Sequence, residues 1–139
     1  MTCITSRVRR SGLSIRFHER PDLCTDHLAA EFEAAPGFWT TVTHGHKIAS
    51  NTERVVQWWK GQAFGSMPGA KSRLLVTGHW HHLRLNIAGD GRLHIQVPAM
   101  DGGSAWYANK SGDDSPPGVV TFWLEPDSSY PVQDLRVHA

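Results

Sequence analysis

The sequence has little cysteine and no long apolar run. Its two cysteines, Cys3 and Cys24, show no C-x-x-C spacing, so neither a disulfide framework nor a cysteine zinc site is expected. No apolar stretch approaches the roughly 20 residues of a membrane-spanning helix, and the first residues lack the apolar core of a signal peptide. We therefore expect a cytoplasmic protein of a reducing compartment, with no membrane partner.

The chain also has almost no excess of charge of one sign. The 14 basic and 13 acidic residues give a formal net charge of +1, which excludes an electrostatic footprint for nucleic acid over the whole chain. The exception is a local excess of arginine at Arg7, Arg9, Arg10, Arg16 and Arg20. Residues 1–20 are thus expected to form a loose basic segment, with a phosphate-contacting arm as the less common alternative to a solvated tail.

What the chain does have is the composition of an ordinary globular domain. Apolar residues make up 40% and charged residues 19% of its 139 residues, which provides for a core of its own. No internal repeat or linker divides it, so we expect a single domain over residues 1–139.

Apolar alternation and turn signals predict a β-rich α/β fold. A helix is expected over 52–64, with Ser50-Asn51 as the N-cap candidate, because an apolar stripe at helical spacing follows these residues. Strands are expected at 13–17, 28–34, 38–43 and 73–78, in a hairpin over 83–97 that turns at 89–91, and at 119–125 and 132–139.

Histidines gather where two of these strands end. Five of them follow the strands at 38–43 and 73–78: His44, His46, His79, His81 and His82. Loops at the carboxyl ends of parallel strands line a common crevice, and the intervening helix allows these two strands to be parallel neighbours. If residues 78–82 continue the strand, His79 and His81 point to one side and originate about 6.6 Å apart. That spacing suits two close metal ions or one between the rings.

A histidine-rich surface is the alternative explanation. The chain has 9 histidines, a number that produces some close pairs by chance. A single histidine is also more often a hydrogen-bonded surface or core residue than a ligand. Spacing alone leaves metal binding and chance about equally open.

The stretches VTHGH and LLVTGHWHH, with the predicted helix between them, resemble the last two metal-binding motifs of the calcineurin-like metallophosphoesterase superfamily. The continuation from IQVPAMDGGSAWY to SPPGVVTFWL resembles the tail of bacteriophage members, and the likeness covers residues 28–124. It implies the C-terminal half of a calcineurin-like four-layer α/β/β/α sandwich. A phage-encoded chain would work in the host cytoplasm.

The resemblance also implies a site and an activity. The implied metal ligands are His44, His79 and His81, and the implied neighbouring or substrate-contacting residues are His46, His82 and Asp101. Asp101 begins an Asp-Gly-Gly sequence, for which a turn is the preferred interpretation. The activity would be hydrolysis of phosphomonoesters or phosphodiesters, those of nucleic acid included, with manganese, zinc or iron. Two close cations would activate a water and stabilise the charge of the leaving oxygen.

The chain departs from the family pattern in its missing carboxylates. The N-terminal motifs Asp-x-His, Gly-Asp-x-x-Asp and Gly-Asn-His are absent, and with them the bridging aspartate and the histidine that would protonate the leaving group. Three imidazoles alone cannot reproduce a dinuclear centre. The expected partners are therefore a phosphoester substrate and either a polypeptide that supplies the N-terminal half or a second copy of this chain. Either would also cover an exposed strand edge and apolar face.

Three functions stay open at this point. The first is a metallophosphoesterase-like hydrolase completed by a separate N-terminal half. The second is a catalytically inactive remnant that binds one metal through His44, His79 and His81, a ligand set with an open fourth position. The third is a small β-rich interaction module whose histidines are close by chance.

Overall fold

The computed structural model describes residues 15–17, 29–48, 51–67, 69–101, 109, 112 and 116–139. The predictions for Cys3, Cys24, most of the arginine-rich segment and most of the loop 102–115 fall on residues outside these ranges.

The described residues form a β-rich α/β structure, which confirms the predicted class at that level. Its elements are β1 (Ile15–Phe17), β2 (Ala29–Ala35), β3 (Phe38–Thr43), α1 (Thr52–Phe64), β4 (Leu74–Thr77), β5 (Arg84–Ile87), β6 (Leu93–Gln96), β7 (Val119–Leu124) and β8 (Val132–His138). These bounds agree closely with the ranges that the sequence predicts. No helix among the described residues is long and apolar enough to cross a membrane.

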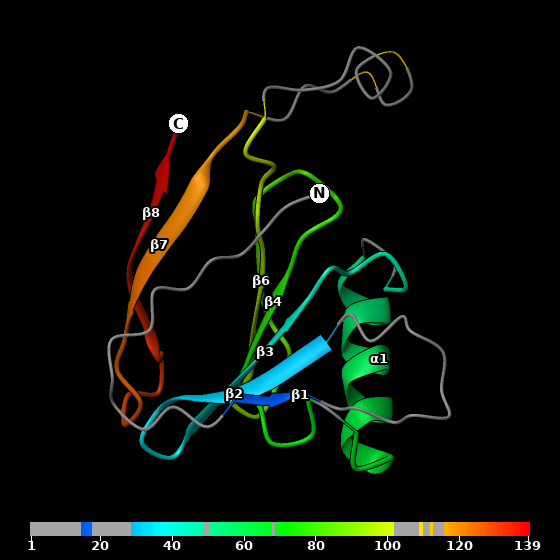
Figure 1. Cartoon of the computed structure of the whole chain (residues 1–139), viewed down its shortest axis with the longest axis vertical. Coiled ribbons are helices and arrows are strands. Elements are labelled where there is room, and N and C mark those ends of the chain that lie inside the picture. The colour runs from blue at the N-terminus through cyan, green and yellow to red at the C-terminus, as the bar shows by residue number, and fades with distance from the viewer. Residues whose placement is uncertain are drawn as a thin grey trace.

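Six strands make one mixed sheet in the order β1-β2-β3-β4-β6-β5, and β7 pairs with β8 in a separate antiparallel sheet (Figure 1). β3 and β4 are parallel neighbours, an arrangement that the intervening helix allows, because α1 carries the chain back between them. β6 lies next to β4 and parallel to it, so β5 is the edge strand on that side of the sheet, and β1 is the other edge. The carboxyl ends of β3, β4 and β6 therefore meet at one end of the sheet.

One face of the large sheet is covered by α1. The helix begins at the predicted cap, where Oδ1 of Asn51 accepts a hydrogen bond from the backbone N–H of Arg54 at 2.8 Å. Its apolar stripe buries Val55 and Trp59 against Leu75 of β4. This contact holds the start of α1 close to the carboxyl ends of β3 and β4.

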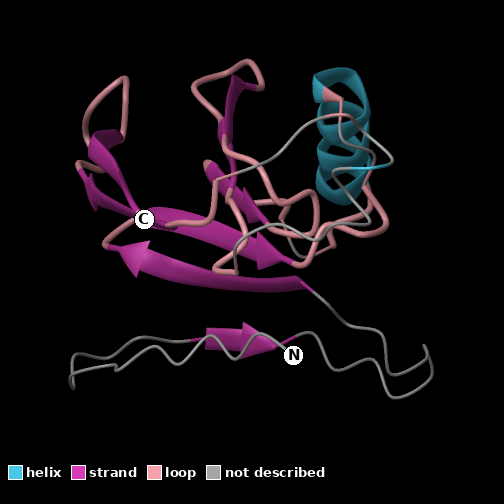
Figure 2. Ribbon diagram, turned by 90° about the horizontal axis from the view of Figure 1, so that it is seen from above, coloured by secondary structure: helices cyan, strands magenta, loops and turns pink. Residues whose placement is uncertain are grey.

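The other face of the large sheet is covered by β7 and β8, so that the helix and the small sheet lie on opposite sides (Figure 1, Figure 2). Phe38, Leu74 and Ile95 are fully buried on this face. Partly buried aliphatic and aromatic side chains from β7 and β8 pack against them. The described chain thus has its main apolar core between the two sheets.

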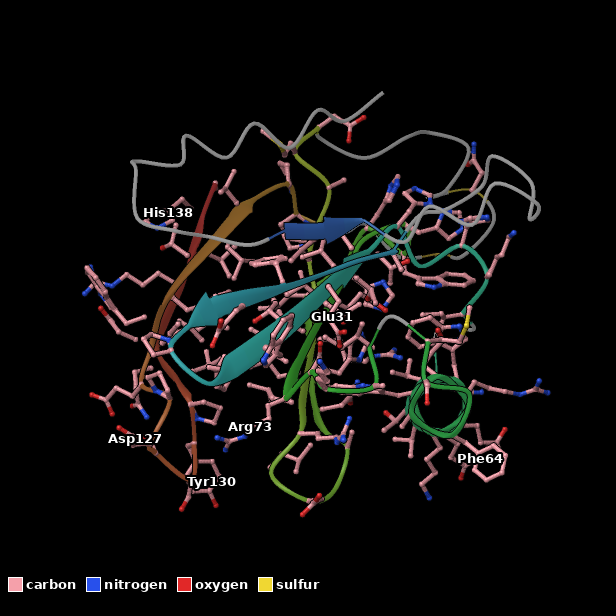
Figure 3. The ribbon with its side chains drawn as sticks, turned by 60° about the horizontal axis from the view of Figure 1, so that its bottom comes forward. Glu31, Phe64, Arg73, Asp127, Tyr130 and His138 are labelled. Atoms are coloured by element: carbon pink, nitrogen blue, oxygen red, sulfur yellow. The ribbon has the colours of Figure 1, made fainter. Side chains whose placement is uncertain are left out.

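Arg73, immediately before β4, ties the turn between β7 and β8 to the large sheet. Its guanidinium donates to the carbonyl oxygens of Pro126 and Ser128, at 2.9 and 3.5 Å (Figure 3). The small sheet is therefore fastened to the large one by polar contacts at the turn as well as by the core.

Candidate metal centre

The loops that follow β3 and β4 cross closely. The backbone N–H of Gly78 donates to the carbonyl of Thr43 at 3.4 Å, which extends the pairing past the end of β4. Gly45 has φ of +90°, and a Cβ added there would lie 3.2 Å from Cβ of Thr77 and 3.3 Å from the carbonyl oxygen of Gly78. Only glycine satisfies both constraints without strain, and its presence lets one histidine loop pass over the other.

This crossing brings three imidazole rings together. The ring centroid of His44 lies 4.8 Å from that of His79 and 5.3 Å from that of His46, and the centroids of His46 and His79 are 6.2 Å apart. The Nδ1 atoms of His44 and His46 are 3.3 Å apart. All three side chains are exposed to solvent. We call His44, His46 and His79 the three-histidine cluster.

Electrostatics within the cluster favour the neutral form of the His79 ring. The pKa of His79 is lowered from its ordinary value, first by partial desolvation and then by the neighbouring charges of His44, His46 and His81. Among these three, His44 has the largest influence and His81 the smallest. A neutral imidazole keeps the lone pair that a metal ion needs.

The loop after β4 is not an extension of the strand. β4 ends at Thr77, and His79 and His81 have left-handed φ values of +69° and +59°. The premise that His79 and His81 alternate with Trp80 along a straight strand is therefore wrong. Two left-handed residues turn the chain sharply, a conformation that is strained for residues other than glycine and tends to occur at functional sites.

Two other predicted site residues stand apart from the cluster. Nδ1 of His82 lies 2.7 Å from the carbonyl oxygen of Trp80, so that nitrogen carries the proton and the ring is held within its own loop. Asp101 is exposed in a bend after β6. Within the described part of the chain, neither residue has a hydrogen bond, ion pair or ring contact with the three-histidine cluster.

The donor atoms fit one metal ion more readily than two. Two nitrogen ligands about 2.0 to 2.1 Å from a tetrahedral zinc ion stand about 3.3 Å apart. The Nδ1 atoms of His44 and His46 have that separation. Among the described residues, no three histidine, cysteine, aspartate or glutamate side chains are already arranged to hold a metal, so the His79 ring must rotate to complete a site. A dinuclear centre would need a bridging carboxylate as well.

A buried polar chain beneath the cluster was not anticipated from the sequence. His94 on β6 is only 1% exposed. Its Nε2 lies 2.8 Å from Oγ1 of Thr77, and its Nδ1 lies 3.1 Å from the amide nitrogen of Asn86. The amide oxygen of Asn86 in turn accepts a hydrogen bond from the hydroxyl of Thr52, at 2.9 Å. The chain runs from the start of α1 to the end of β4.

The direction of these hydrogen bonds sets the tautomer of His94. Since the amide oxygen of Asn86 accepts from Thr52, its amide N–H donates to Nδ1 of His94, which leaves Nε2–H to donate to Thr77. Burial, and secondly the charge of Arg84, lowers the pKa of His94 to about 4. The signal in the sequence was the alternation in LHIQ, where apolar Leu93 and Ile95 require His94 to face the helix side.

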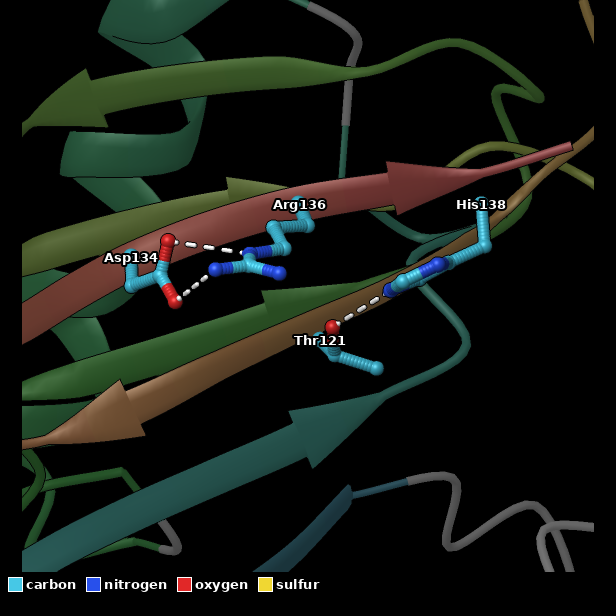
Figure 4. A network of polar contacts seen from close by, with 4 residues as sticks. All are labelled: Thr121, Asp134, Arg136 and His138. Carbon is cyan, nitrogen blue, oxygen red and sulfur yellow. Dashed lines mark hydrogen bonds and ion pairs between the residues drawn. The ribbon is translucent and has the colours of Figure 1, made fainter.

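Two hollows elsewhere on the surface are not lined by any residue of the cluster. One, of about 370 Å³, lies between α1 and the turn of the β5–β6 hairpin. The other, of about 410 Å³, lies on the outer face of β7 and β8 beside the exposed Trp123. Its polar side chains are paired with one another, Asp134 with Arg136 and Thr121 with His138 (Figure 4).

No protein-family model matches the sequence, and neither the curated proteins nor the solved structures contain a significant match.

Proposed function

We propose that this chain carries part of a metallophosphoesterase-like metal site and serves the metal-dependent hydrolysis of phosphoesters, with nucleic-acid phosphodiesters among the candidate substrates. In this proposal residues 1–139 are a partial domain, the C-terminal half of a calcineurin-like four-layer α/β/β/α sandwich. The proposed location is the cytoplasm, that of the host if a phage encodes the chain. The scarcity of cysteine supports it.

The observation that carries the proposal is the 4.8 Å separation of the His44 and His79 rings at the carboxyl ends of parallel strands. These two histidines come from VTHGH and LLVTGHWHH, the stretches that resemble the superfamily. Two loops distant in sequence thus converge on one point through the topology that the resemblance requires.

The residues of this chain have defined tasks in the proposed reaction. A bound divalent metal, manganese, zinc or iron, would supply Lewis acidity toward a phosphoryl oxygen. His44 and His79 would hold it, and the pKa of His79 is lowered by desolvation and then by the charge of His44, which favours the neutral ring that binds metal. Gly45 keeps the two loops in contact, because a larger residue there would meet Thr77 and Gly78.

The carboxylates and the acid of the reaction would come from outside this sequence. A surface suited to such a partner lies next to the site. β5 is an edge strand of the large sheet; Leu83 just before it and Leu85 and Ile87 within it are 38%, 47% and 67% exposed. An open strand edge with apolar side chains favours pairing with another polypeptide or with a second copy. β5 follows directly on the loop of His79, so a strand added there would end beside the cluster.

The proposal is tested by the neighbouring gene sequence and then by activity. The reading frames upstream of this chain are expected to encode Asp-x-His and Gly-Asn-His. Co-expression of that product with this chain is expected to give manganese-dependent hydrolysis of a chromogenic phosphodiester. The matched control carries His44→Ala and His79→Ala. Any hydrolysis that it shows comes from a contaminating phosphatase and is subtracted. An upstream region with neither motif in any frame, or activity no higher than that of the control, contradicts the proposal.

A catalytically inactive remnant, which binds one metal or acts as an interaction module, is the second candidate. The make-up of the three-histidine cluster favours it, since in the described residues three imidazoles meet without a carboxylate. The two candidates separate in the co-expression experiment. A remnant would bind metal but show the same hydrolysis as its histidine variants, with or without the second polypeptide.

A further inference from the structure

We infer that His46 is the third ligand of this site in place of His81. His44, His46 and His79 would then form a mononuclear zinc site with one open coordination position. The inference rests on the proposed function in one respect, that the cluster binds a metal. It departs from the resemblance, which assigns His46 no direct bond to metal.

The first argument is the separation of the donor atoms. Nδ1 of His44 and Nδ1 of His46 lie 3.3 Å apart, the distance between two nitrogen ligands of tetrahedral zinc. In the metal-free chain, one of these nitrogens carries a proton and donates it to the other. When both bind zinc, that proton moves to Nε2 of its own ring.

The second argument is the position of the third ring. The centroid of His79 is 4.8 Å from that of His44 and 6.2 Å from that of His46, so both are its neighbours. His79 is exposed and can rotate its ring toward the shared Nδ1 pair without breaking a packed core.

The third argument is the backbone between the two paired histidines. Gly45 separates His44 from His46 and adopts φ of +90°, a conformation that side-chain-bearing residues rarely accept. The reversal at this glycine turns His46 back toward His44 instead of carrying it away along an extended strand. A His-Gly-His sequence in this conformation makes a two-ligand unit from histidines two positions apart.

Zinc is the metal that this ligand set suits. Imidazole nitrogen is a preferred ligand of zinc, whereas manganese and magnesium favour carboxylate and water oxygens. Three protein ligands with a free fourth position are typical of a zinc ion that takes water or a substrate oxygen. The exposure of all three rings leaves that position accessible to a phosphoester.

The test is zinc binding to the purified chain, measured by isothermal titration calorimetry and by metal content after dialysis. We expect one zinc per chain. His46→Ala is expected to weaken binding by at least about 100-fold, and the matched variant His81→Ala by less than about 5-fold. Cobalt provides a spectroscopic readout, since a tetrahedral site absorbs visible light strongly and should lose that intensity in His46→Ala alone. Circular dichroism without metal checks that both variants remain folded.

The possible outcomes separate this inference from the function on which it rests. If His81→Ala weakens binding and His46→Ala does not, the third ligand is His81; the inference fails, and the His44 and His79 pair survives. Two zinc ions per chain would also overturn the mononuclear site. If the wild-type chain binds no zinc, manganese or iron, the inference and the proposed metal site both fail.

Discussion

The two faces of the six-stranded sheet are built from different kinds of residue. Toward β7 and β8 the buried positions are apolar, with Phe38, Leu74 and Ile95 surrounded by partly buried aliphatic side chains. Toward α1 the buried apolar cluster is small, and polar residues of the sheet surround it. The buried polar side chains on this face are Thr41, Thr43, Thr77, His94 and Gln96.

The two faces of the sheet therefore have different roles: one mainly stabilises the fold, and the other positions the histidine loops. Burying a polar group is costly unless it is hydrogen-bonded, so a polar interior is retained only where its bonds are satisfied. On the helix side Thr77 bonds to His94, and Gln96 donates to the carbonyl of His82 at 3.1 Å. The first bond holds the last residue of β4, and the second reaches the loop that bears His79. The helix side therefore orients the histidine loops, while the apolar side supplies most of the hydrophobic stabilisation.

The largest expected effects come from two adjacent leucines that point to opposite faces. Leu74 and Leu75 are both fully buried, the first against β7 and β8 and the second against α1. We expect Leu74→Ala to lower the free energy of unfolding by about 4 kcal/mol and Leu75→Ala by about 3 kcal/mol, because more side chains pack around Leu74. Urea denaturation measures both values. A reversed order would mean that the helix side is the better packed face.

The next effect is a loss of stability in acid that arises from His94 on the helix side. His94 has a folded-state pKa of about 4, below its ordinary value of 6.5, so the folded chain favours the neutral ring. The resulting stabilisation is complete above pH 6.5 and is lost as the pH falls through 4. By linkage, its size is about 3 kcal/mol. Denaturation of wild type and His94→Gln over this pH range measures it, and equal slopes for the two proteins would refute it.

A smaller effect is expected at a carboxylate that ties β2 to the loop before β4. Oε1 of Glu31 accepts hydrogen bonds from the backbone N–H of Gly69 and Lys71 and from the hydroxyl of Ser72, at 3.0, 3.1 and 2.9 Å. Its side chain lies toward the interior between these elements (Figure 3). Glu31→Gln keeps the shape but removes the charge that strengthens all three bonds, and should cost about 1 to 2 kcal/mol.

The matched control for Glu31 is on the same strand. Glu33 accepts a single bond, from the exposed backbone N–H of Gly37. Glu33→Gln is expected to change the unfolding free energy by less than about 0.5 kcal/mol. Thermal denaturation of the two variants in parallel compares their losses of stability. If both variants lose the same stability, the effect comes from negative charge on β2 in general and not from the three hydrogen bonds of Glu31.

The smallest effects are opposite in sign at two neighbouring threonines. Thr40 faces the apolar side, and its Oγ1 is the one buried side-chain polar atom without a hydrogen-bond partner among the described residues. Thr41 faces the helix side and shares a 2.6 Å hydrogen bond with Ser72. We expect Thr40→Val to raise stability by about 1 kcal/mol and Thr41→Val to lower it by about as much. If both changes destabilise the chain, the buried threonine hydroxyls are hydrogen-bonded on both faces, and the two faces do not differ in this respect.

The elements were predictable because each is signalled by nearby residues. Asn51 caps the helix as expected, and the turn from Gly89 to Gly91 has left-handed φ values throughout, as its sequence requires. The order of strands was not predictable in the same way. From local signals, either strand of the hairpin could pair with β4. β6 takes that place, and its Leu93 and Ile95 pack in the core between the two sheets. Packing between distant residues makes that choice, and no local sequence signal predicts it.

By itself, the sequence determined where the strands and the helix lie and that histidines follow β3 and β4, since period, caps and turn residues act over a few positions. Only the tertiary structure decided that the His46 ring joins those of His44 and His79, and that His94 is buried beneath them. The physical reason is that these proximities depend on how two loops cross at Gly45 and on left-handed residues at which strand alternation ends. Such contacts are fixed by backbone geometry between segments distant in the chain.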